Sequence, residues 1–420
     1  MSSRVAVIGS GISGLAAAYF LSRKHDVWLF ERDARLGGHT NTVVVDTEQG
    51  ALALDTGFLV HNDRTYPTLV RLFNELGVAT HASDMCFAVT CRRSGLEYSS
   101  RGARGFFAQP ANLLRAAHWR LLREILRFNR EAPAFLAQPE AERWTLGEFL
   151  DSRGFDGLFT GRYLFPMASA IWSAPLDSIR DFPALTLIRF LDNHGLLAVN
   201  GQPMWKTVRG GSHTYIPKLT APLRDRVHTG ATIGGVRRHE QDVEVLFVDR
   251  PAMRFDHVVF ACHGDQVLPL LLDASDAERD VFSQFTTTTN VTWLHRDGAV
   301  LPRRPLARAS WNYLLARGDA APTVTYHLNR LQDLQARDAF CVTLNPENAP
   351  DGTIDERLVL RRFVYQHPQY TRASVAAQQR WGEVSGARRT HFCGAYWFYG
   401  FHEDGLRSAL RVAHALGVTW

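Results

Sequence analysis

The chain has 420 residues, of which 45% are hydrophobic, and its formal net charge is +5 at pH 7. This length allows two or three domains with a large buried core, and the composition excludes wholesale disorder. No apolar run approaches the roughly 18 residues that a membrane-spanning helix needs, and a strand-like segment begins at Arg4. We therefore expect neither a spanning helix nor a signal peptide, and we expect a cytoplasmic location.

The charged residues and the cysteines exclude further classes of protein. The 47 basic and 42 acidic residues are interspersed, so nucleic-acid binding is not expected. The five cysteines lack C-x-x-C spacing, and His402-Glu403 lacks the second histidine of a zinc motif. We predict free thiols and no metal site.

The first residues predict a nucleotide-binding unit of strand, turn and helix. Arg4–Ile8 is typical of a buried parallel strand, and it leads through Gly9, Gly11 and Gly14, in G-x-G-x-x-G spacing, into a helix. In this context Gly9 permits a tight turn, and Gly11 lets a pyrophosphate approach the backbone. Gly14 allows the helix to pack closely on the strand.

A second strand, Asp26–Phe30, ends at Glu31. An acidic side chain at this place is positioned to accept hydrogen bonds from a ribose, and its charge argues against a 2′-phosphate. The alternative, a glycine-rich turn that serves packing only, would not require this acid. We therefore expect Ile12, Ser13 and Glu31 to contact a bound dinucleotide, because a helix N-terminus offers N–H donors and a positive dipole end.

The next segment, Glu31–Thr40, has the form E-x-x-x-R-x-G-G and resembles the FAD enzymes of the flavin-containing amine oxidase and phytoene desaturase superfamily. The resemblance implies non-covalent FAD lying along Arg35 and the Gly37–Gly38 turn. Covalent attachment through His39 is the less favoured alternative. Leu54–Phe58 is similar to the D-x-G segment beside the flavin. The contacts implied here are Arg32, Arg35, Gly37, Gly38, His39, Thr40, Asp55, Gly57 and Phe58.

The segment His391–Leu410 looks like the C-terminal flavin motif of the same superfamily. A helix that starts near Asp404–Gly405 would direct its N–H groups and its dipole at the flavin edge. The alternative is a C-capped surface helix, which the aromatic density of Tyr396–Phe401 disfavours. The contacts implied here are Gly394, Asp404, Gly405 and Ser408, and Cys393 is interpreted as a packing residue.

The middle of the chain predicts the remaining strands of a cofactor domain. Val227–Ile233 and Val243–Phe247 alternate like antiparallel strands, and Phe255–Cys262 is typical of a buried strand. The resemblance places Ile233 against adenine. The predicted fold is α/β: a discontinuous Rossmann-like FAD-binding domain (1–80, 205–270 and 388–420) with an α+β substrate domain (81–204 and 271–387).

Further segments resemble a narrower bacterial subgroup of fatty-acid-modifying flavoproteins that accompany cyclopropane-fatty-acid-synthase-like enzymes. They include Asn193–Gly195, Trp205–Tyr215 and Gly400–Gly405. The resemblance implies hydride removal from a C–H bond of a lipophilic, fatty-acyl or phospholipid substrate by a desaturase or a double-bond isomerase. No second G-x-G-x-x-G follows, so no NADPH domain is expected. The flavin is then reoxidised by oxygen or another carrier, or returns its hydride to the substrate.

Two other functions stay open. Amine oxidases of the superfamily usually carry a lysine near flavin N5, in strands that follow the adenine-side unit, but the only lysines here are Lys24, Lys206 and Lys218. An amine oxidase is therefore the second hypothesis, and a flavin-bound interaction or chaperone protein is the third.

The candidate catalytic residues are His194, His213, His402 and Glu403. A histidine with a pKa near neutrality suits proton transfer, although a single histidine is more often structural. His402 and Glu403 are favoured because they precede the helix expected at the flavin edge.

Asn112–Arg130 is predicted to form an amphipathic helix. Leu114, Leu121, Leu122, Ile125 and Phe128 share one face, opposite Arg115, Arg120, Arg123, Arg127 and Arg130. With Phe106 and Phe107 upstream, this helix would rest on an anionic membrane or, as the favoured alternative, pack on the substrate domain.

Overall fold

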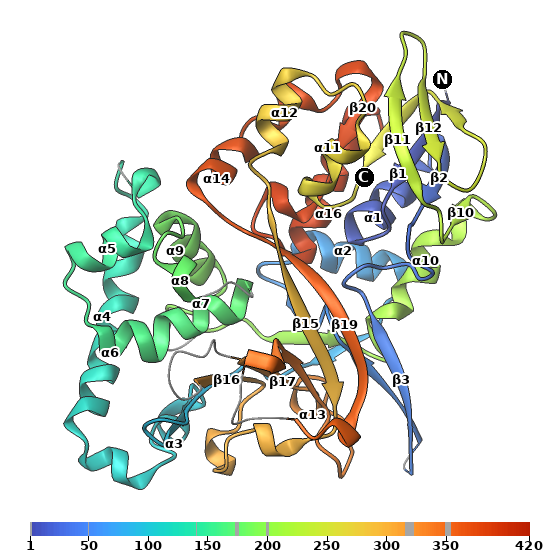
Figure 1. The fold of residues 1–420 in the computed structure, drawn as a ribbon. Coiled ribbons are helices and arrows are strands. Elements are labelled where there is room, and N and C mark those ends of the chain that lie inside the picture. Colours follow the sequence, from blue (N-terminus) through green and yellow to red (C-terminus); the bar gives the residue numbers. More distant parts are fainter. Residues whose placement is uncertain are drawn as a thin grey trace.

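The computed structural model describes residues 2–48, 50–139, 141–172, 176–198, 201–315, 323–348 and 354–420. Figure 1 shows two regions, one around a parallel sheet near both termini and one around a larger sheet with a helical layer beside it. Among the described residues, no helix is both long and apolar enough to cross a bilayer. The five cysteines are all free.

The first sheet consists of five parallel strands. In spatial order they are β10 (Val227–His228), β2 (Asp26–Phe30), β1 (Arg4–Ile8), β14 (His257–Phe260) and β20 (Thr390–Phe392). These strands come from three separate parts of the chain, as a discontinuous Rossmann-like fold requires.

The two faces of this sheet are covered differently. Val5 and Val7 pack into the core shared with helices α1 (Ile12–Leu21) and α16 (His402–Ala415). Ala6 and Ile8 point to the opposite side, because side chains alternate along a strand. There they meet an antiparallel sheet made of β11 (Ile233–Arg238), β12 (Val243–Phe247) and β13 (Met253–Phe255).

The second large sheet has seven strands. In spatial order they are β19 (Val359–Pro368), β15 (Thr287–His295), β18 (Cys341–Leu344), β17 (Thr323–His327), β16 (Trp311–Leu315), β7 (Phe87–Cys91) and β8 (Leu96–Ser99). All neighbours are antiparallel except β16 and β7. The helical layer comprises α3 (Gly102–Phe106), α4 (Ala116–Phe135), α5 (Leu146–Ser152), α6 (Gly157–Phe159), α7 (Phe165–Trp172), α8 (Leu176–Ile179) and α9 (Ala184–Asn193).

The paired strands β15 and β19 connect the two regions (Figure 1). At one end, the hydroxyl of Thr287 donates to Asp265, which follows β14, at 2.6 Å. At the other end, His295 pairs with Cys341 of β18. Side chains at the Thr287 end of this ribbon therefore lie close to the carboxyl edge of the parallel sheet.

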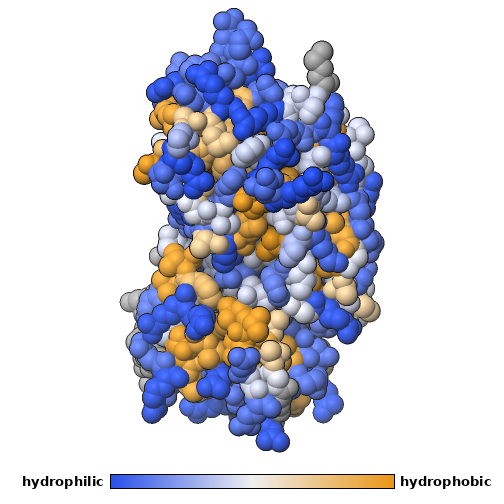
Figure 2. All heavy atoms as spheres, turned by 90° about the vertical axis from the view of Figure 1, so that its right-hand side faces the viewer, coloured by the Kyte–Doolittle hydropathy of each residue, from blue (hydrophilic) through white to orange (hydrophobic). Residues whose placement is uncertain are grey.

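Short elements complete the fold. The helices are α2 (Pro67–Leu76), α10 (Ile216–Thr220), α11 (Val267–Leu270), α12 (Asp276–Phe282), α13 (Leu328–Leu331), α14 (Arg372–Gln378) and α15 (Trp381–Val384). The strands are β3 (Thr42–Thr47) and β4 (Gly50–Asp55), which pair with each other, and β5 (His61–Asn62), β9 (Trp205–Val208) and β6 (Thr80–Ala82), which form a small sheet. Figure 2 shows the right-hand side of Figure 1, where β3 and β19 lie and hydrophobic side chains gather in the lower half.

The structure corrects three predicted boundaries. Val227–Ile233 is not one strand: Gly230 adopts a left-handed φ of +64°, so β10 and β11 belong to different sheets. The strand expected over 255–262 is divided into β13 and β14. The last helix begins at His402, so His402 and Glu403 lie in its first turn and do not precede it.

The two large sheets support the proposed domain boundaries. The parallel sheet draws its strands from 1–80, 205–270 and 388–420, and the seven-stranded sheet draws its strands from 81–204 and 271–387. We keep these boundaries as a proposal, with the β15–β19 ribbon as the connection between the domains.

Candidate functional site

The turn between β1 and α1, which contains Gly9, Gly11 and Gly14, forms an open surface that we call the cradle. α1 has Gly11 as its N-cap residue, and no side chain caps its first N–H groups. A Cβ built on Gly11 would meet nothing within 4 Å, whereas one built on Gly14 would collide with the carbonyl oxygen of Gly9. Gly9 itself has a φ of +99°. This geometry lets a phosphate approach the helix N-terminus closely.

Glu31 is fixed beside this cradle, at the carboxyl end of β2. One carboxylate oxygen accepts the N–H of Ser10 at 2.8 Å and its hydroxyl at 2.5 Å, and the other accepts the N–H of Asp33 at 2.9 Å. The side chain of Arg32 extends into solvent and lies 3.8 Å from Asp33. The acid expected to bind ribose is therefore next to the cradle, and Arg32 points outward.

The Gly37–Gly38 turn lies directly against the cradle. Gly37 has a φ of +110° and Gly38 one of +55°, which favour glycine. A Cβ on Gly38 would lie 3.3 Å from the Cα of Gly11. Arg35 donates to the carbonyl oxygen of Gly38 at 2.7 Å, so its guanidinium holds the turn in shape.

Three distant segments converge beyond this turn. Nε2 of His402 lies 3.1 Å from the hydroxyl of Thr40. The His402 ring stacks on Phe58, with 3.8 Å between ring centroids. A Cβ on Gly57 would collide with the carbonyl oxygen of His39. The structure thus brings the Gly-Gly turn, the D-x-G segment and the C-terminal motif together.

Asp55 has a supporting position in this assembly. Its buried carboxylate accepts the hydroxyl of Thr42 at 2.5 Å and both the N–H (2.9 Å) and the hydroxyl (2.8 Å) of Ser212. Burial raises the pKa of Asp55 to about 6. These hydrogen bonds join β4 to the turn after β9.

The N-termini of α1 and α16 lie in contact. A Cβ on Gly405 would lie 2.7 Å from Cγ2 of Ile12 and 2.8 Å from the hydroxyl of Ser13. Ser408 accepts the N–H of Gly394 at 2.8 Å, which fixes the strand-to-helix crossing. Two positive dipole ends therefore meet at the site, which favours a ligand that carries negative charge.

Ile233, expected at the adenine, begins β11 and pairs with Phe247. The N–H of Ala231 donates to the carbonyl oxygen of Glu31 at 2.8 Å. The chain before Ile233 therefore runs beside Glu31, the acid expected to bind ribose, and the adenine contact stays a prediction.

His39 belongs to a largely buried cluster of aromatic rings that the sequence analysis missed. Its ring centroid lies 4.9 Å from that of Tyr365, 5.1 Å from that of His367 and 6.3 Å from that of His263. Burial and the neighbouring histidines hold the pKa of His39 well below its usual value, and that of His367 is lowered to about 4. These rings are therefore neutral at pH 7.

One member of this cluster had a readable signal in the sequence. His263 closely follows β14, and ligands of parallel sheets bind outside the carboxyl ends of the strands. The position of His367 had no such signal in the sequence, because it depends on the pairing of β19 with β15. In this pair of strands, the side chain of Asn290 lies 2.9 Å from Nδ1 of His367.

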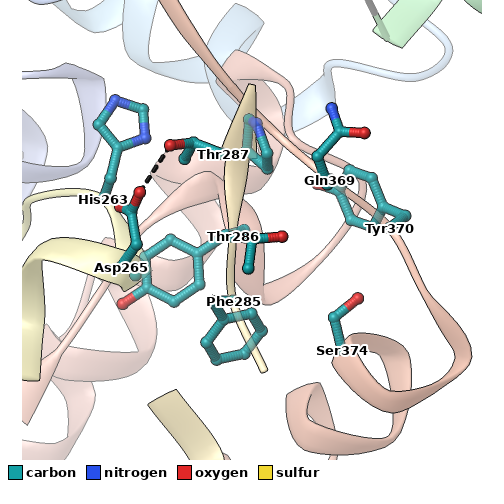
Figure 3. A pocket seen from close by; sticks show the side chains of 11 residues that line it. His263, Asp265, Phe285, Thr286, Thr287, Gln369, Tyr370 and Ser374 are labelled. Carbon is teal, nitrogen blue, oxygen red and sulfur yellow. Dashed lines mark hydrogen bonds between the residues drawn. The ribbon is translucent and has the colours of Figure 1, made fainter. Parts of the chain in front are cut away.

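A small cavity lies next to His263. Figure 3 shows His263 and Asp265 on one side, Gln369 and Tyr370 on the other, and Thr286 and Thr287 between them. Its volume of about 10 Å³ is the space of a single water molecule. It is too small for an organic substrate.

A larger cavity of about 390 Å³ opens at the N-terminus of α16. This volume falls in the range of small-molecule sites. The lining residues are Arg64, Thr65, Tyr66, Pro67, Thr68, Asn193, His194, Tyr399, Phe401, Glu403, Asp404 and Arg407. Two of the four candidate catalytic residues, His194 and Glu403, are therefore in one cavity.

Two of the histidine candidates, His402 and His194, do not have the near-neutral pKa that motivated their choice. Burial lowers the pKa of His402 to about 3 and that of His194 to about 4. Nδ1 of His194 contacts the carbonyl oxygen of Phe190 at 2.9 Å, as expected for a helix end. His213 is exposed in the turn after β9. His402 and His194 are therefore poor proton acceptors at pH 7, and His213 lies outside a closed site.

Glu403 caps another helix. Its two carboxylate oxygens accept the N–H groups of Thr68 at 3.1 Å and Leu69 at 2.9 Å, in the first turn of α2. A carboxylate at a helix N-terminus is stabilised by these donors and by the helix dipole.

Asp404 has the pKa that suits proton transfer. Its side chain lines the larger cavity, and one oxygen accepts the N–H of Phe401 at 3.0 Å. Burial raises the pKa of Asp404 to about 7. An acid–base group works best when its pKa lies near the working pH.

Comparison with known proteins identifies the family. Residues 12–354 match the family described as flavin containing amine oxidoreductase. The chain belongs to this family. It is 42% identical over 76 residues to protoporphyrinogen oxidase 2 of Arabidopsis thaliana, a match that covers 18% of this chain and 14% of that protein. The chain thus matches about a seventh of that relative's length.

Solved structures with the same fold have different activities. The CLA-producing fatty acid isomerase from P. acnes has a TM-score of 0.71 and 17% identity, and the likeness covers 99% of both chains. A putrescine oxidase has a TM-score of 0.70 and 16% identity, covering 99% of this chain and 98% of that chain. At these identities the likeness shows the fold and leaves the substrate open.

The site fits the cofactor of this family, FAD. The cradle is open at Gly11, two helix N-termini meet beside it, and the buried Nε2 of His39 has no hydrogen-bond partner among the described residues. A buried polar atom needs such a partner, which a ligand would provide. Bound FAD supplies a hydride acceptor. The protein is thus a flavin-dependent oxidoreductase.

We expect Glu403→Ala to lower the free energy of unfolding by about 1 to 2 kcal/mol, because two N–H groups of α2 lose their acceptor. Glu403→Gln should restore most of this loss, since the amide oxygen still accepts a hydrogen bond. Urea unfolding measures the role of Glu403 as the cap of α2, and turnover measures a role in catalysis. A stable Glu403→Gln protein without turnover would make Glu403 a catalytic residue.

Proposed function

We propose that this protein removes hydride from a C–H bond of a lipophilic, fatty-acyl substrate, as a desaturase or a double-bond isomerase, with FAD held non-covalently. The acyl chain is free or part of a phospholipid. The cavity at the N-terminus of α16 is the observation that carries this proposal.

The walls of this cavity suit a hydrocarbon chain. Tyr66, Tyr399 and Phe401 line it, and the ring of Phe401 stacks on Phe190 with 4.8 Å between centroids. Behind them lies the apolar core of the helical layer. Arg64 lines the cavity with an exposed guanidinium, which suits the carboxylate or phosphate group of an acyl lipid.

The lysines argue against the amine oxidase chemistry of the family. Lys24 donates to the carbonyl oxygen of Gly417 at 3.1 Å, and Lys206 pairs with Asp63 at 2.6 Å. Lys218 donates to the carbonyl oxygen of Leu76 at 2.8 Å. These three are the only lysines of the chain, so none remains to assist at a flavin.

Asp404 is the residue that we propose as the proton acceptor. In a desaturation, the hydride and its electron pair leave one carbon and a proton leaves the next, so the site needs a base. The Asp404 carboxylate lines the cavity and is held by the N–H of Phe401. His402, stacked on Phe58 and in contact with Thr40, would then position the first turn of α16.

An amine oxidase is the second candidate. Glu403 and Asp404 both line the cavity, and carboxylates among aromatic rings suit a cationic amine. Glu403, however, is engaged by the N-terminus of α2, and half of the Asp404 carboxyl groups are protonated near pH 7. The cavity therefore holds less negative charge than its composition suggests.

Lipid profiling tests the proposal without a guess about the substrate. Lipids from cells with and without the gene are compared by mass spectrometry, and the purified protein is then incubated with the lipids of cells that lack it. We expect an acyl species to lose two hydrogens or to shift a double bond. Unsaturated or branched chains are the preferred candidates, because their neighbouring C–H bonds are activated. Unchanged lipids in both experiments would contradict the proposal.

A further inference from the structure

Helix α4 has a buried face and an outer face, and both carry apolar residues. Leu121, Ile125 and Phe128 pack into the core of the helical layer, as the favoured alternative predicted. The helix spans Ala116–Phe135 instead of 112–130, so Leu114 lies before it and does not share this face. The outer face, about half a turn away, presents Trp119, with 49% of its surface exposed, and Leu126, with 46% exposed. These two residues lie seven positions apart, so they share one side of the helix.

The apolar surface continues into the turn before α4. Leu113 is 51% exposed and Leu114 is 91% exposed. The indole N–H of Trp119 donates to the carbonyl oxygen of Leu113 at 2.9 Å, and the Trp119 ring lies 4.8 Å from that of Phe107. Four of the ten large exposed hydrophobic residues in the described part of the chain thus lie within residues 113–126.

This surface is also basic. Between Glu97 and Glu124 the chain has no acidic residue and contains Arg101, Arg104, Arg115, Arg120 and Arg123. Arg120 pairs with Asp156 at 3.2 Å and Arg123 lies 3.9 Å from Glu124. The Arg120–Asp156 pair is exposed and therefore weak, and the Glu124 carboxylate lies closer to Arg127, at 2.8 Å. Arg101, Arg104 and Arg115 form no ion pair with any described residue, and Arg130, on the same side of α4 as Trp119, lies 3.5 Å from Glu131.

We propose that this surface docks on an anionic phospholipid bilayer. The α4 surface consists of Phe107, Leu113, Leu114, Trp119 and Leu126 together with Arg115, Arg123 and Arg130. Its aromatic and aliphatic side chains would lie at the headgroup boundary, and its guanidinium groups would bind lipid phosphates. This mode of binding is peripheral and depends on the charge of the lipid.

Charge favours a membrane over a second copy of the chain. In a twofold-symmetric dimer the same patch is used by both subunits, so the arginines of one α4 surface would face those of the other. A bilayer that contains acidic lipids offers the complementary charge. Away from α4, strand β19 also has an exposed apolar residue, Val364, at 66%. It provides a matched control.

Sedimentation of the FAD-loaded protein with vesicles tests this proposal. We expect binding to vesicles of phosphatidylcholine with phosphatidylglycerol, weaker binding to phosphatidylcholine alone, and loss of binding at high salt. The double variant Leu114→Ser/Trp119→Ser should bind at least tenfold more weakly. Changing Arg115, Arg123 and Arg130 to Gln should weaken binding about 100-fold, at about fivefold per arginine.

The controls remove one exposed valine and one exposed arginine elsewhere. Val364→Ser and Arg279→Gln should bind as the unchanged protein does, and flavin content confirms that every variant is folded. Equal or absent binding to both kinds of vesicle would overturn the proposal. So would variants of the α4 surface that bind normally. If Leu114→Ser/Trp119→Ser instead turned a dimer into a monomer, the surface would be a subunit interface.

Discussion

Gly11→Val is expected to give a folded protein that binds FAD at least about 100-fold more weakly, or not at all. A Cβ at this position meets nothing within 4 Å, so the fold has room for the new side chain. A pyrophosphate would reach the N-terminus of α1 through the same open space, and the side chain of a valine would fill that space. Absorbance of the purified protein and the FAD released on denaturation measure the effect.

Two matched glycine variants separate cofactor binding from folding. Gly157 also has nothing within 4 Å of a built Cβ, so Gly157→Val should retain FAD. Gly14→Ala places its methyl group on the carbonyl oxygen of Gly9 and should lower the free energy of unfolding by about 3 kcal/mol. Full FAD loading in Gly11→Val would show that the cradle is not the phosphate site. Flavin that stays on the denatured chain would show that its attachment is covalent.

Asp404→Asn is expected to lower turnover at least about 100-fold while FAD stays bound. General bases contribute rate factors of about 100 to 10,000. The amide has the size of the carboxyl group, and its oxygen still accepts the N–H of Phe401, which lies 3.0 Å from the carboxylate. Single-turnover flavin reduction measures the effect. Unchanged reduction with a natural lipid extract would exclude Asp404 as the base.

The pH dependence of stability gives an independent test of Asp404. Burial raises its pKa from 3.8 to about 7, so the folded protein keeps a proton that the unfolded chain has released. Stability therefore falls as pH rises from about 4 to about 7, by up to about 4 kcal/mol from this residue. Asp404→Asn lacks this part of the decrease. Asp55, with a pKa raised to about 6, contributes in the same direction to both proteins. Parallel curves for the two proteins would contradict the assignment.

Local patterns in the sequence were sufficient for two strands of the parallel sheet. β1 and β2 begin and end where their short apolar runs and the glycine motif predict, because an apolar run and the following turn determine each of them. Gly230 was the sequence signal for the break between β10 and β11, since a left-handed φ of +64° ends a strand.

The active-site chemistry was less predictable because it depends on burial and on contacts between distant segments. The low pKa of His402 follows from its burial beside Phe58 and Thr40, residues more than 300 positions away. The capping of α2 by Glu403 joins two helices from opposite ends of the chain. Neither contact has a local signature, so residue type alone predicted the wrong pKa for His402 and gave no sign that Glu403 caps α2.

Anaerobic mixing of the FAD-loaded protein with two panels, one of primary amines and one of unsaturated fatty acids and phospholipids, tests the central claim most directly. Flavin absorbance is followed in time, and the products are analysed by mass. We predict no reduction by amines, together with acyl products that have lost two hydrogens or carry a shifted double bond. Rapid flavin reduction by an amine, with no conversion of any lipid, would contradict the account and make the protein an amine oxidase.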